Sequence, residues 1–216
     1  MPIAICPSPP MLVPEVAQGA SDDLLDLRTR CDAAVRRLLD RGADTITVIG
    51  SAPARGRWIR TAGGTLRGFG PDVRAGGDDL VLPLSLTIGA WLLDRAGWGG
   101  ARSYVAVTGD EAVEVRGPVL VMADGTAKRS ESAPGHIDDR APTYDKVIAE
   151  ALANGDARTL AGLDPALAQQ LWAAGAPSLR VLGRSVGATE VVRARLTYDA
   201  APFGVGYFVA EWDLAA

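Results

Sequence analysis

The pattern of apolar and polar positions predicts alternating strands and helices. Residues 2–6 form a short apolar run and residues 45–50 a β-branched run, so both are expected to be buried strands. Between them, residues 21–41 carry an apolar stripe at helical spacing, formed by Leu24, Leu27, Cys31, Val35 and Leu38. A helix is therefore expected over residues 21–41, with Ser21 as its cap and Gly42 at its exit.

The rest of the chain continues this alternation. Helices are expected over residues 84–96, 138–154, 165–174 and 178–186. Strands are expected over residues 103–107, 119–123, 190–198 and 204–212, with 112–115 as a weaker candidate. The last two strands, joined by residues 199–203, are expected to form a hairpin. In the helix over 138–154, the pattern predicts that Ile137, Val147, Ile148 and Leu152 face inward.

This order of elements predicts a single α/β domain over residues 1–216. Its central sheet is expected to be mostly parallel or mixed, with helices on both faces. No repeat, linker or low-complexity tract divides the chain. Ligand sites in such sheets lie beyond the carboxyl ends of the strands. The segments to consider are therefore residues 6–14, 50–58 and 123–130, together with the region around Glu211.

Residues 51–79 lack a regular apolar pattern and are expected to be a loop rich in glycine and arginine. Its basic residues are Arg55, Arg57, Arg60, Arg67 and Arg74. Two interpretations of the segment 55–74 remain open. It is either an anion-binding lid over the site, made mobile by its glycines, or a solvated or dimer-contacting loop.

Composition and charge narrow the class of protein. The 216 residues are 48% hydrophobic, which is typical of a globular α/β protein, and no apolar run approaches the roughly 18 residues that span a bilayer. The first residues do not resemble a signal peptide, so a cytoplasmic location without membrane contact is expected. A net charge of −4 argues against a nucleic-acid partner. Cys6 and Cys31 are expected to be reduced and buried.

The chain contains one histidine, His136. Imidazole is the commonest ligand of catalytic first-row metals and the commonest general base near neutral pH. A metal site with two or three histidines is therefore excluded. The strand-to-helix GxSxG motif of Ser–His–Asp hydrolases is also absent. The glycine-rich stretch over residues 63–68 lacks the GK[ST] ending of a P-loop.

Several segments resemble the superfamily formed by the B-type subunits of class III extradiol ring-cleavage dioxygenases, which includes the Memo-like proteins. The opening loop reads Pro7-Ser8-Pro9-Pro10-Met11-Leu12-Val13-Pro14, where that superfamily typically has Pro-His-Pro-Pro followed by an apolar residue and Val-Pro. Further similar segments are residues 44–53, 123–129, 133–138 with 144–147, and the closing stretch 202–210. The chain most resembles a small actinobacterial-type branch.

The resemblance implies the α/β fold of that superfamily, and a site that active members build around Fe(II) with two histidines and a carboxylate. A further histidine acts as acid and base. The first ligand position falls here at Ser8 and the second within residues 51–57. The acid–base histidine falls at residues 127–129, where Lys128 is the nearest substitute, and the carboxylate corresponds to Glu211. Because no histidine stands at these positions, the Fe(II) site is expected to be lost, with no metal or other cofactor.

The leading hypothesis is a degenerate member that keeps the pocket without ring cleavage. It would bind a small anionic molecule or a partner through a pocket formed by Ser8, Ser51, Asp124, Lys128 and Glu211. One alternative is a divergent oxidoreductase or other enzyme, with a metal held by oxygen ligands or with metal-free chemistry at Lys128 or His136. Another is a non-catalytic scaffold subunit. Homo-oligomers or a partner subunit remain open, as does whether the chain is an enzyme.

Overall fold

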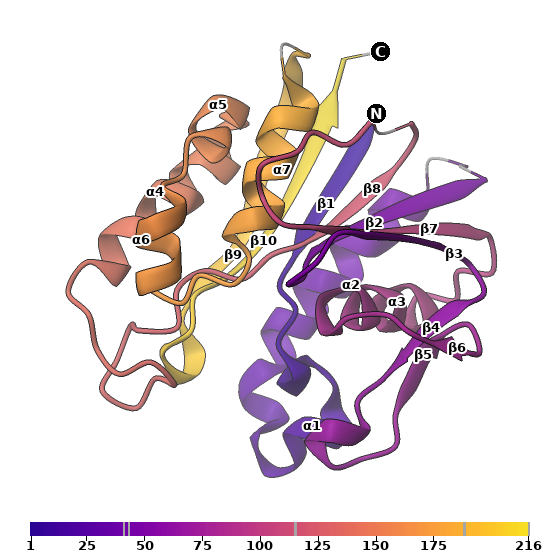
Figure 1. Cartoon of the computed structure of the whole chain (residues 1–216), viewed down its shortest axis with the longest axis horizontal. Coiled ribbons are helices and arrows are strands. Elements are labelled where there is room, and N and C mark those ends of the chain that lie inside the picture. The colour runs from indigo at the N-terminus through magenta and orange to yellow at the C-terminus, as the bar shows by residue number, and fades with distance from the viewer. Residues whose placement is uncertain (41, 43, 115, 188, 216) are drawn as a thin grey trace.

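The computed structural model describes residues 1–40, 42, 44–114, 116–187 and 189–215, and these form one α/β fold (Figure 1). Its main sheet is seven-stranded and mixed, with the order β3-β7-β2-β8-β1-β10-β9. The strands are β1 (Pro2–Cys6), β2 (Thr45–Ser51), β3 (Gly56–Ile59), β7 (Ala101–Val107), β8 (Val119–Met122), β9 (Val191–Ala200) and β10 (Tyr207–Leu214). The four central strands β7, β2, β8 and β1 are parallel, and antiparallel strands flank them on both sides.

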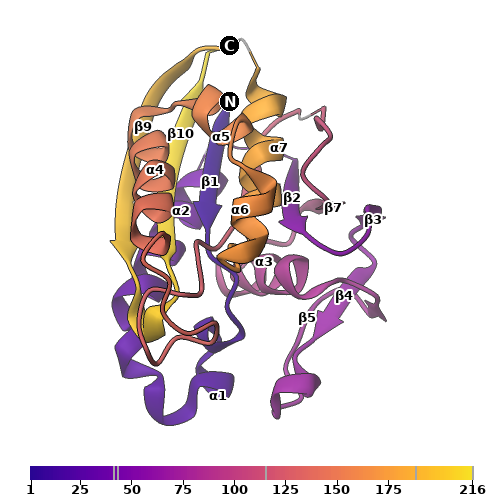
Figure 2. The same ribbon diagram turned by 60° about the vertical axis from the view of Figure 1, so that its left-hand side comes forward.

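Helices cover both faces of this sheet (Figure 2). One layer contains α2 (Leu25–Leu39) and α3 (Leu84–Arg95). The other contains α4 (Ala141–Asn154), α5 (Ala157–Ala161), α6 (Pro165–Gln170) and α7 (Ala176–Val186). Side chains alternate across a strand, so Ile3 and Ile5 of β1 join the core under α4–α7, whereas Ala4 and Cys6 join the core under α2 and α3. The two apolar cores therefore lie on opposite sides of one sheet.

The position of β8 creates a crevice at one end of the sheet. After β1 the chain passes through the short α1 (Pro14–Ala17) to α2, and after β2 it passes through residues 52–83 to α3, on the same face as α2. β8 lies between β1 and β2 but leads to α4–α7 on the opposite face. Neighbouring parallel strands whose connections leave on opposite faces open a crevice beyond their carboxyl ends, where ligands bind in such folds.

The expectation of an irregular loop over residues 51–79 is wrong. β3 pairs antiparallel with β7 at the edge of the main sheet, and three short strands form a second sheet of order β5-β4-β6. These are β4 (Ala62–Thr65), β5 (Arg74–Gly76) and β6 (Asp79–Leu80). The backbones in this region pack so closely that the strands need glycines. These glycines interrupt the alternation of apolar and polar residues by which a strand is predicted. A Cβ at Gly63 would lie 1.8 Å from the Gly77 carbonyl oxygen, and one at Gly64 would lie 1.9 Å from Thr87 Oγ1 on α3.

The first predicted helix begins later than expected. α2 starts at Leu25, after a 3₁₀ turn over Asp22–Leu24, and ends at Leu39 with Asp40 as its C-cap, while residue 41 of the expected range lies outside the described residues. Ser21 does not cap it. Instead, the carbonyl and hydroxyl oxygens of Ser21 both accept hydrogen bonds from the Arg28 guanidinium. The Ser21 hydroxyl thus contacts a buried arginine, while the Ser21 carbonyl also accepts a hydrogen bond from the Leu24 amide at 3.3 Å.

Other boundaries also differ. α4 begins at Ala141 rather than 138, so Ile137 lies before the helix and is exposed, and Val147 is also exposed, whereas Ile148 and Leu152 are buried. The helix expected over 165–174 ends at Gln170. Residues 112–114 form no strand, and residue 115 of that weaker candidate lies outside the described residues. The terminal hairpin is confirmed, since β9 and β10 pair antiparallel.

Within the described residues, no helix is both long and apolar enough to cross a membrane. Cys6 and Cys31 are both buried and free of a disulfide bond, as the sequence predicted.

Candidate functional site

A pocket of about 260 Å³ opens in the crevice beyond the carboxyl ends of β1, β2 and β8. We call it the Ser8–Asp124 pocket. Its polar lining comes from Ser8 after β1, Ser51 at the end of β2, Asp124 after β8, Ser85 at the start of α3, and Tyr207 at the start of β10. The remaining lining residues are Pro9, Pro10, Leu84, Met122, Gly125, Ala127, Trp172, Ala174, Gly175 and Val205. The segments that form the pocket are thus far apart in the sequence and converge at one end of the sheet.

Ser8 and Asp124 form the polar centre of the pocket. The Ser8 amide donates to Asp124 Oδ1 at 2.8 Å, and its hydroxyl donates to Oδ2 at 3.0 Å. Ser8 stands between Pro7 and Pro9, whose rings fix the backbone angle φ and hold the loop extended. The loop is further anchored by Leu12, whose side chain is fully buried. A stiff loop therefore presents both hydrogen-bond donors of Ser8 to one carboxylate.

The loop carrying Asp124 is fixed from two sides. The Asp124 backbone pairs with Tyr207, and Gly206 exchanges backbone hydrogen bonds with Gly125 and Thr126. Below it, the buried Asp145 of α4 accepts hydrogen bonds from the amide and the hydroxyl of Thr126. The position of the Asp124 carboxylate is thus set by β10 and α4 as well as by Ser8.

Burial raises the pKa of Asp124 from its ordinary 3.8 to about 6, because removal from water disfavours the ionised carboxylate. The two hydrogen bonds from Ser8 act in the opposite direction and limit the shift. The pKa of Tyr207 is also raised, chiefly by its own burial and further by the nearby Asp124 charge. A carboxyl group that titrates near neutral pH and faces a pocket is typical of functional sites.

Ser51 and Ser85 fix the opposite wall of the pocket. Ser51 Oγ accepts a hydrogen bond from the Ser178 amide at 3.1 Å, in the first turn of α7, and lies 2.7 Å from Ser178 Oγ. The Ser51 carbonyl accepts a hydrogen bond from Ser85 Oγ at 2.8 Å. The end of β2 is thereby tied to the starts of both α3 and α7. These serines hold helices in place, and their hydroxyl groups are largely engaged with the protein.

Trp172 forms much of the apolar wall. Its side chain is 54% exposed, and its backbone has a φ of +55°, in the left-handed region that bulky residues rarely adopt. Strained backbone of this kind costs of order 1–3 kcal/mol and clusters at binding sites. A large apolar surface is thus held open to solvent beside Asp124.

The residues expected to form one site are only partly brought together. Ser8, Ser51 and Asp124 line the pocket. Lys128 is not part of the lining; its Nζ lies 5.6 Å from the centre of the Trp172 ring, so it stands beside the pocket wall in a cation–π contact.

Glu211 and His136 lie outside the pocket. Glu211 sits in the middle of β10 opposite Ala4, four residues beyond Tyr207, and its Oε2 lies 3.5 Å from Arg37 Nε on α2. Glu211 was expected to line the pocket, but it does not. Its carboxylate instead joins α2 to the sheet. His136 is exposed, with a φ of +59°, and belongs to a turn in which its amide donates to the Ala133 carbonyl.

The donor atoms in the pocket do not fit the iron site that the resemblance implies. Fe(II) in such sites takes two imidazoles and a carboxylate. The lining supplies one carboxylate, whose two oxygens already accept hydrogen bonds from Ser8, and no imidazole. In the described part of the chain, no three His, Cys, Asp or Glu side chains are grouped so that they could hold a metal ion.

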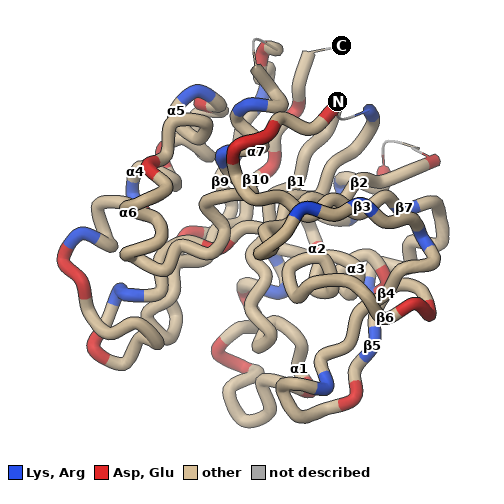
Figure 3. Tube along the Cα trace, in the orientation of Figure 1, with Lys and Arg blue, Asp and Glu red and all other residues tan. Residues whose placement is uncertain are grey.

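The arginine-rich segment does not line this pocket. Residues 55–74 contain one acidic residue, Asp72, and the small sheet carries both basic and acidic positions (Figure 3). Asp72 pairs with Arg67 and Arg74, and Glu111 pairs with Arg55 at 3.2 Å. No residue of 55–74 is part of the Ser8–Asp124 lining, so the lid interpretation gains no support.

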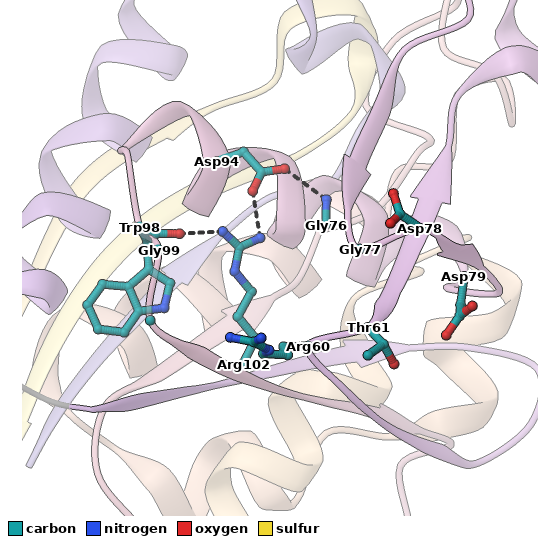
Figure 4. A pocket seen from close by; sticks show the side chains of 11 residues that line it. Arg60, Thr61, Gly76, Gly77, Asp78, Asp79, Asp94, Trp98, Gly99 and Arg102 are labelled. Carbon is teal, nitrogen blue, oxygen red and sulfur yellow. Dashed lines mark hydrogen bonds and ion pairs between the residues drawn. The ribbon is translucent and has the colours of Figure 1, made fainter.

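A larger cavity of about 460 Å³ lies between the small sheet and the end of α3 (Figure 4). Asp94 of α3 is one of its lining residues. It accepts a hydrogen bond from the Gly76 amide at 2.8 Å and pairs with Arg102 at 2.6 Å. Arg102 also donates to the Trp98 carbonyl at 2.6 Å. These charged groups hold the small sheet against α3, and their mutual pairing points to a structural role.

Sequence reasoning missed three residues that shape the Ser8–Asp124 pocket, namely Trp172, Tyr207 and Ser85. Ser85 lies at the start of the helix expected over residues 84–96, and Pro83 just before that helix is the only local signal of its position. Tyr207 stands at the start of the closing strand, directly after Gly206. No local signal marks Trp172, because it lies in an irregular turn between two short helices.

Comparisons of the chain with protein-family models and with curated proteins find no match.

Proposed function

We propose that this chain binds a small molecule in the Ser8–Asp124 pocket and does not cleave aromatic rings. In this proposal it is a divergent relative of the class III extradiol dioxygenase superfamily that has lost the iron-ligand histidines. The observation that carries the binding function is the Asp124 carboxylate, held by Ser8 in a pocket whose walls are mostly apolar. An apolar pocket with a few fixed polar groups is typical of small-molecule sites.

The lining favours a ligand with a hydrogen-bond donor rather than the anion expected from the sequence. None of the lining residues is lysine, arginine or histidine, and Asp124 would repel a second negative charge. A hydroxyl or amine group can donate to Asp124, while an apolar body contacts Trp172 and Pro9. The volume of about 260 Å³ lies just below the roughly 300–1,000 Å³ of drug-sized pockets, so a metabolite-sized ligand is appropriate.

The raised pKa of Asp124 favours a second candidate function, which is acid–base catalysis on the bound molecule. A general base works best when its pKa lies near the operating pH, and the pKa of this carboxyl group is about 6. Asp124 would then accept a proton from the hydroxyl or amine of the ligand that it binds. This candidate function uses only a side chain of the pocket and requires no metal.

The test is a fragment screen by ligand-observed NMR at pH 7.5, using small phenols, aliphatic alcohols, amines and carboxylates. The wild type is compared with Asp124→Asn, which can keep both contacts to Ser8 by accepting from its amide and donating to its hydroxyl. We expect phenols, alcohols or amines to bind the wild type about tenfold or more tightly than the variant, since a hydrogen bond to a charged group contributes roughly 1.5–3 kcal/mol.

Asp139→Asn is the matched control, because it removes an exposed carboxylate from a turn that does not line the pocket. It should leave binding unchanged. The proposal fails if no phenol, alcohol or amine binds, or if Asp124→Asn binds the same fragments as tightly as the wild type.

A further inference from the structure

We propose that a second pocket binds a small carboxylate through Arg180. This Arg180 pocket has a volume of about 290 Å³ and lies between the loop after β7 and the helices α6 and α7. Its apolar wall consists of Pro165, Ala168, Ala173, Ala176 and Pro177. It shares Ala174 with the Ser8–Asp124 pocket, so the two pockets lie side by side. The Ser8–Asp124 pocket has no basic residue in its lining, whereas this pocket has the guanidinium of Arg180.

The Arg180 guanidinium is held in a fixed orientation. The residue is only 8% exposed, Nε donates to the Gly109 carbonyl at 3.2 Å, and Nη1 donates to the Leu163 carbonyl. Nη2 donates to Asp110 Oδ1 at 2.9 Å. A guanidinium has five N–H donors, so these three bonds leave donor capacity for a ligand. Its planar fork matches a carboxylate.

The charge of Arg180 is poorly compensated within the protein. Its carboxylate partner, Asp110, has a side chain that is 74% exposed, and Arg184 Nη1 also lies 3.7 Å from the same oxygen. An exposed ion pair is screened by water and contributes little, whereas a buried charge is costly unless it is paired. A ligand carboxylate inside the pocket would pair with Arg180 in a less polar environment and displace Asp110 from it.

The loop that carries Asp110 can release this side chain without unfolding. The Glu111 carboxylate accepts hydrogen bonds from the amides of Thr108, Gly109 and Asp110, and fixes the backbone independently of the Asp110 side chain. Gly109 has a φ of +109°, and a Cβ there would lie 3.2 Å from Pro177 Cα, so glycine allows the loop to approach α7 closely. A ligand carboxylate can therefore replace Asp110 as the hydrogen-bond partner of the Arg180 guanidinium.

The test is a titration of the ¹⁵N-labelled full chain with butyrate, followed through the amide signals of Ala168, Ala173 and Ala176. Removing Arg180 would also free two backbone carbonyls, so the informative variant is Asp110→Asn, which removes only the competing charge. We expect saturable shifts in the wild type and a Kd about two- to fivefold lower in Asp110→Asn, the range given by an exposed ion pair. Butyramide should cause no shift at these amides.

Asp23→Asn is the matched control, since it changes the net charge equally at an exposed site in the 3₁₀ turn before α2. It should leave the Kd unchanged. The proposal is overturned if butyrate causes no saturable shift, if butyramide acts as butyrate does, or if Asp110→Asn fails to lower the Kd. It is also overturned if Asp23→Asn lowers the Kd equally. Amides of Gly125 and Tyr207 report on the Ser8–Asp124 pocket, so either pocket can fail without the other.

Discussion

At the scale of single residues, Asp124 depends on Ser8 for both hydrogen bonds to its carboxylate. Folding removes the carboxylate from water without providing a positively charged partner within the pocket lining. Its ionised form is thus less stable in the folded protein than in the unfolded chain, and the raised pKa expresses this cost. The group is retained at a cost to stability, which is typical of functional positions.

The stability of the protein should depend on the ionisation of Asp124. Its folded pKa of about 6 lies above the ordinary 3.8, so its contribution is most favourable below pH 4 and is lost as the pH rises through 6. Asp124→Asn removes this loss. Relative to the wild type, the free energy of unfolding of the variant should rise by on the order of 2–3 kcal/mol between pH 4 and pH 7.5.

Urea unfolding of both proteins at several pH values measures this difference directly. Other carboxylates titrate in the same range, but their contributions cancel in the comparison of the two proteins. A difference in unfolding free energy that does not change between pH 4 and pH 7.5 would show that Asp124 titrates normally.

At the scale of elements, the start of α7 fits closely against the loop after β8. The Gly175 amide donates to the Asp124 carbonyl at 3.1 Å, and a Cβ at Gly175 would lie 2.1 Å from the Asp124 amide nitrogen. The backbone of Gly175 has a φ of −84°, so its requirement for glycine is steric and does not arise from an unusual conformation. The residue before α7 thereby forms part of the lining of the Ser8–Asp124 pocket.

Gly175→Ala should displace either α7 or the Asp124 loop. We expect a loss of about 1–3 kcal/mol in unfolding free energy, as for other overpacked sites, together with weaker ligand binding. The control is Gly19→Ala, because a Cβ at Gly19 would meet nothing within 4 Å. Thermal and urea unfolding of both variants provide the measurement. Equal stability of the two variants would disprove this close fit.

The elements also show what the sequence could reveal. Regular apolar runs such as residues 45–50 predicted the central strands, and strand ends correctly indicated that Ser8, Ser51 and Asp124 would meet. Short strands rich in glycine, such as Ala62–Thr65, gave no such signal because close backbone packing replaces apolar side chains there. Glu211 was misplaced since its register on β10, four residues beyond Tyr207, follows only from strand pairing.

At the scale of the whole molecule, β10 connects the two cores. Phe208, Ala210 and Trp212 point into the core under α4–α7, whereas Tyr207 and Val209 join the core under α2 and α3. The same strand therefore completes both hydrophobic layers and delivers Tyr207 to the pocket. The global stability of the fold and the shape of the site depend on one C-terminal strand.

Trp212→Ala should destabilise the entire molecule. Its side chain is 1% exposed, and Nε1 donates to the Leu152 carbonyl at 2.8 Å, so the variant creates a cavity and leaves that carbonyl without its partner. We expect a loss of about 3–5 kcal/mol in unfolding free energy. Trp172→Ala, at a side chain that is 54% exposed, is the matched control and should cost much less. Similar losses for both tryptophans would contradict this view of the core.

The most direct test of the central claim is an NMR titration of the Asp124 side-chain carboxyl carbon in ¹³C-labelled protein. The titration is recorded with and without the tightest fragment from the screen. We predict a pKa near 6 in the free protein, and a clear decrease when a ligand donates a hydrogen bond to the ionised carboxylate. A pKa near the ordinary 3.8 in the free protein, or a pKa that no bound fragment changes, would contradict the account.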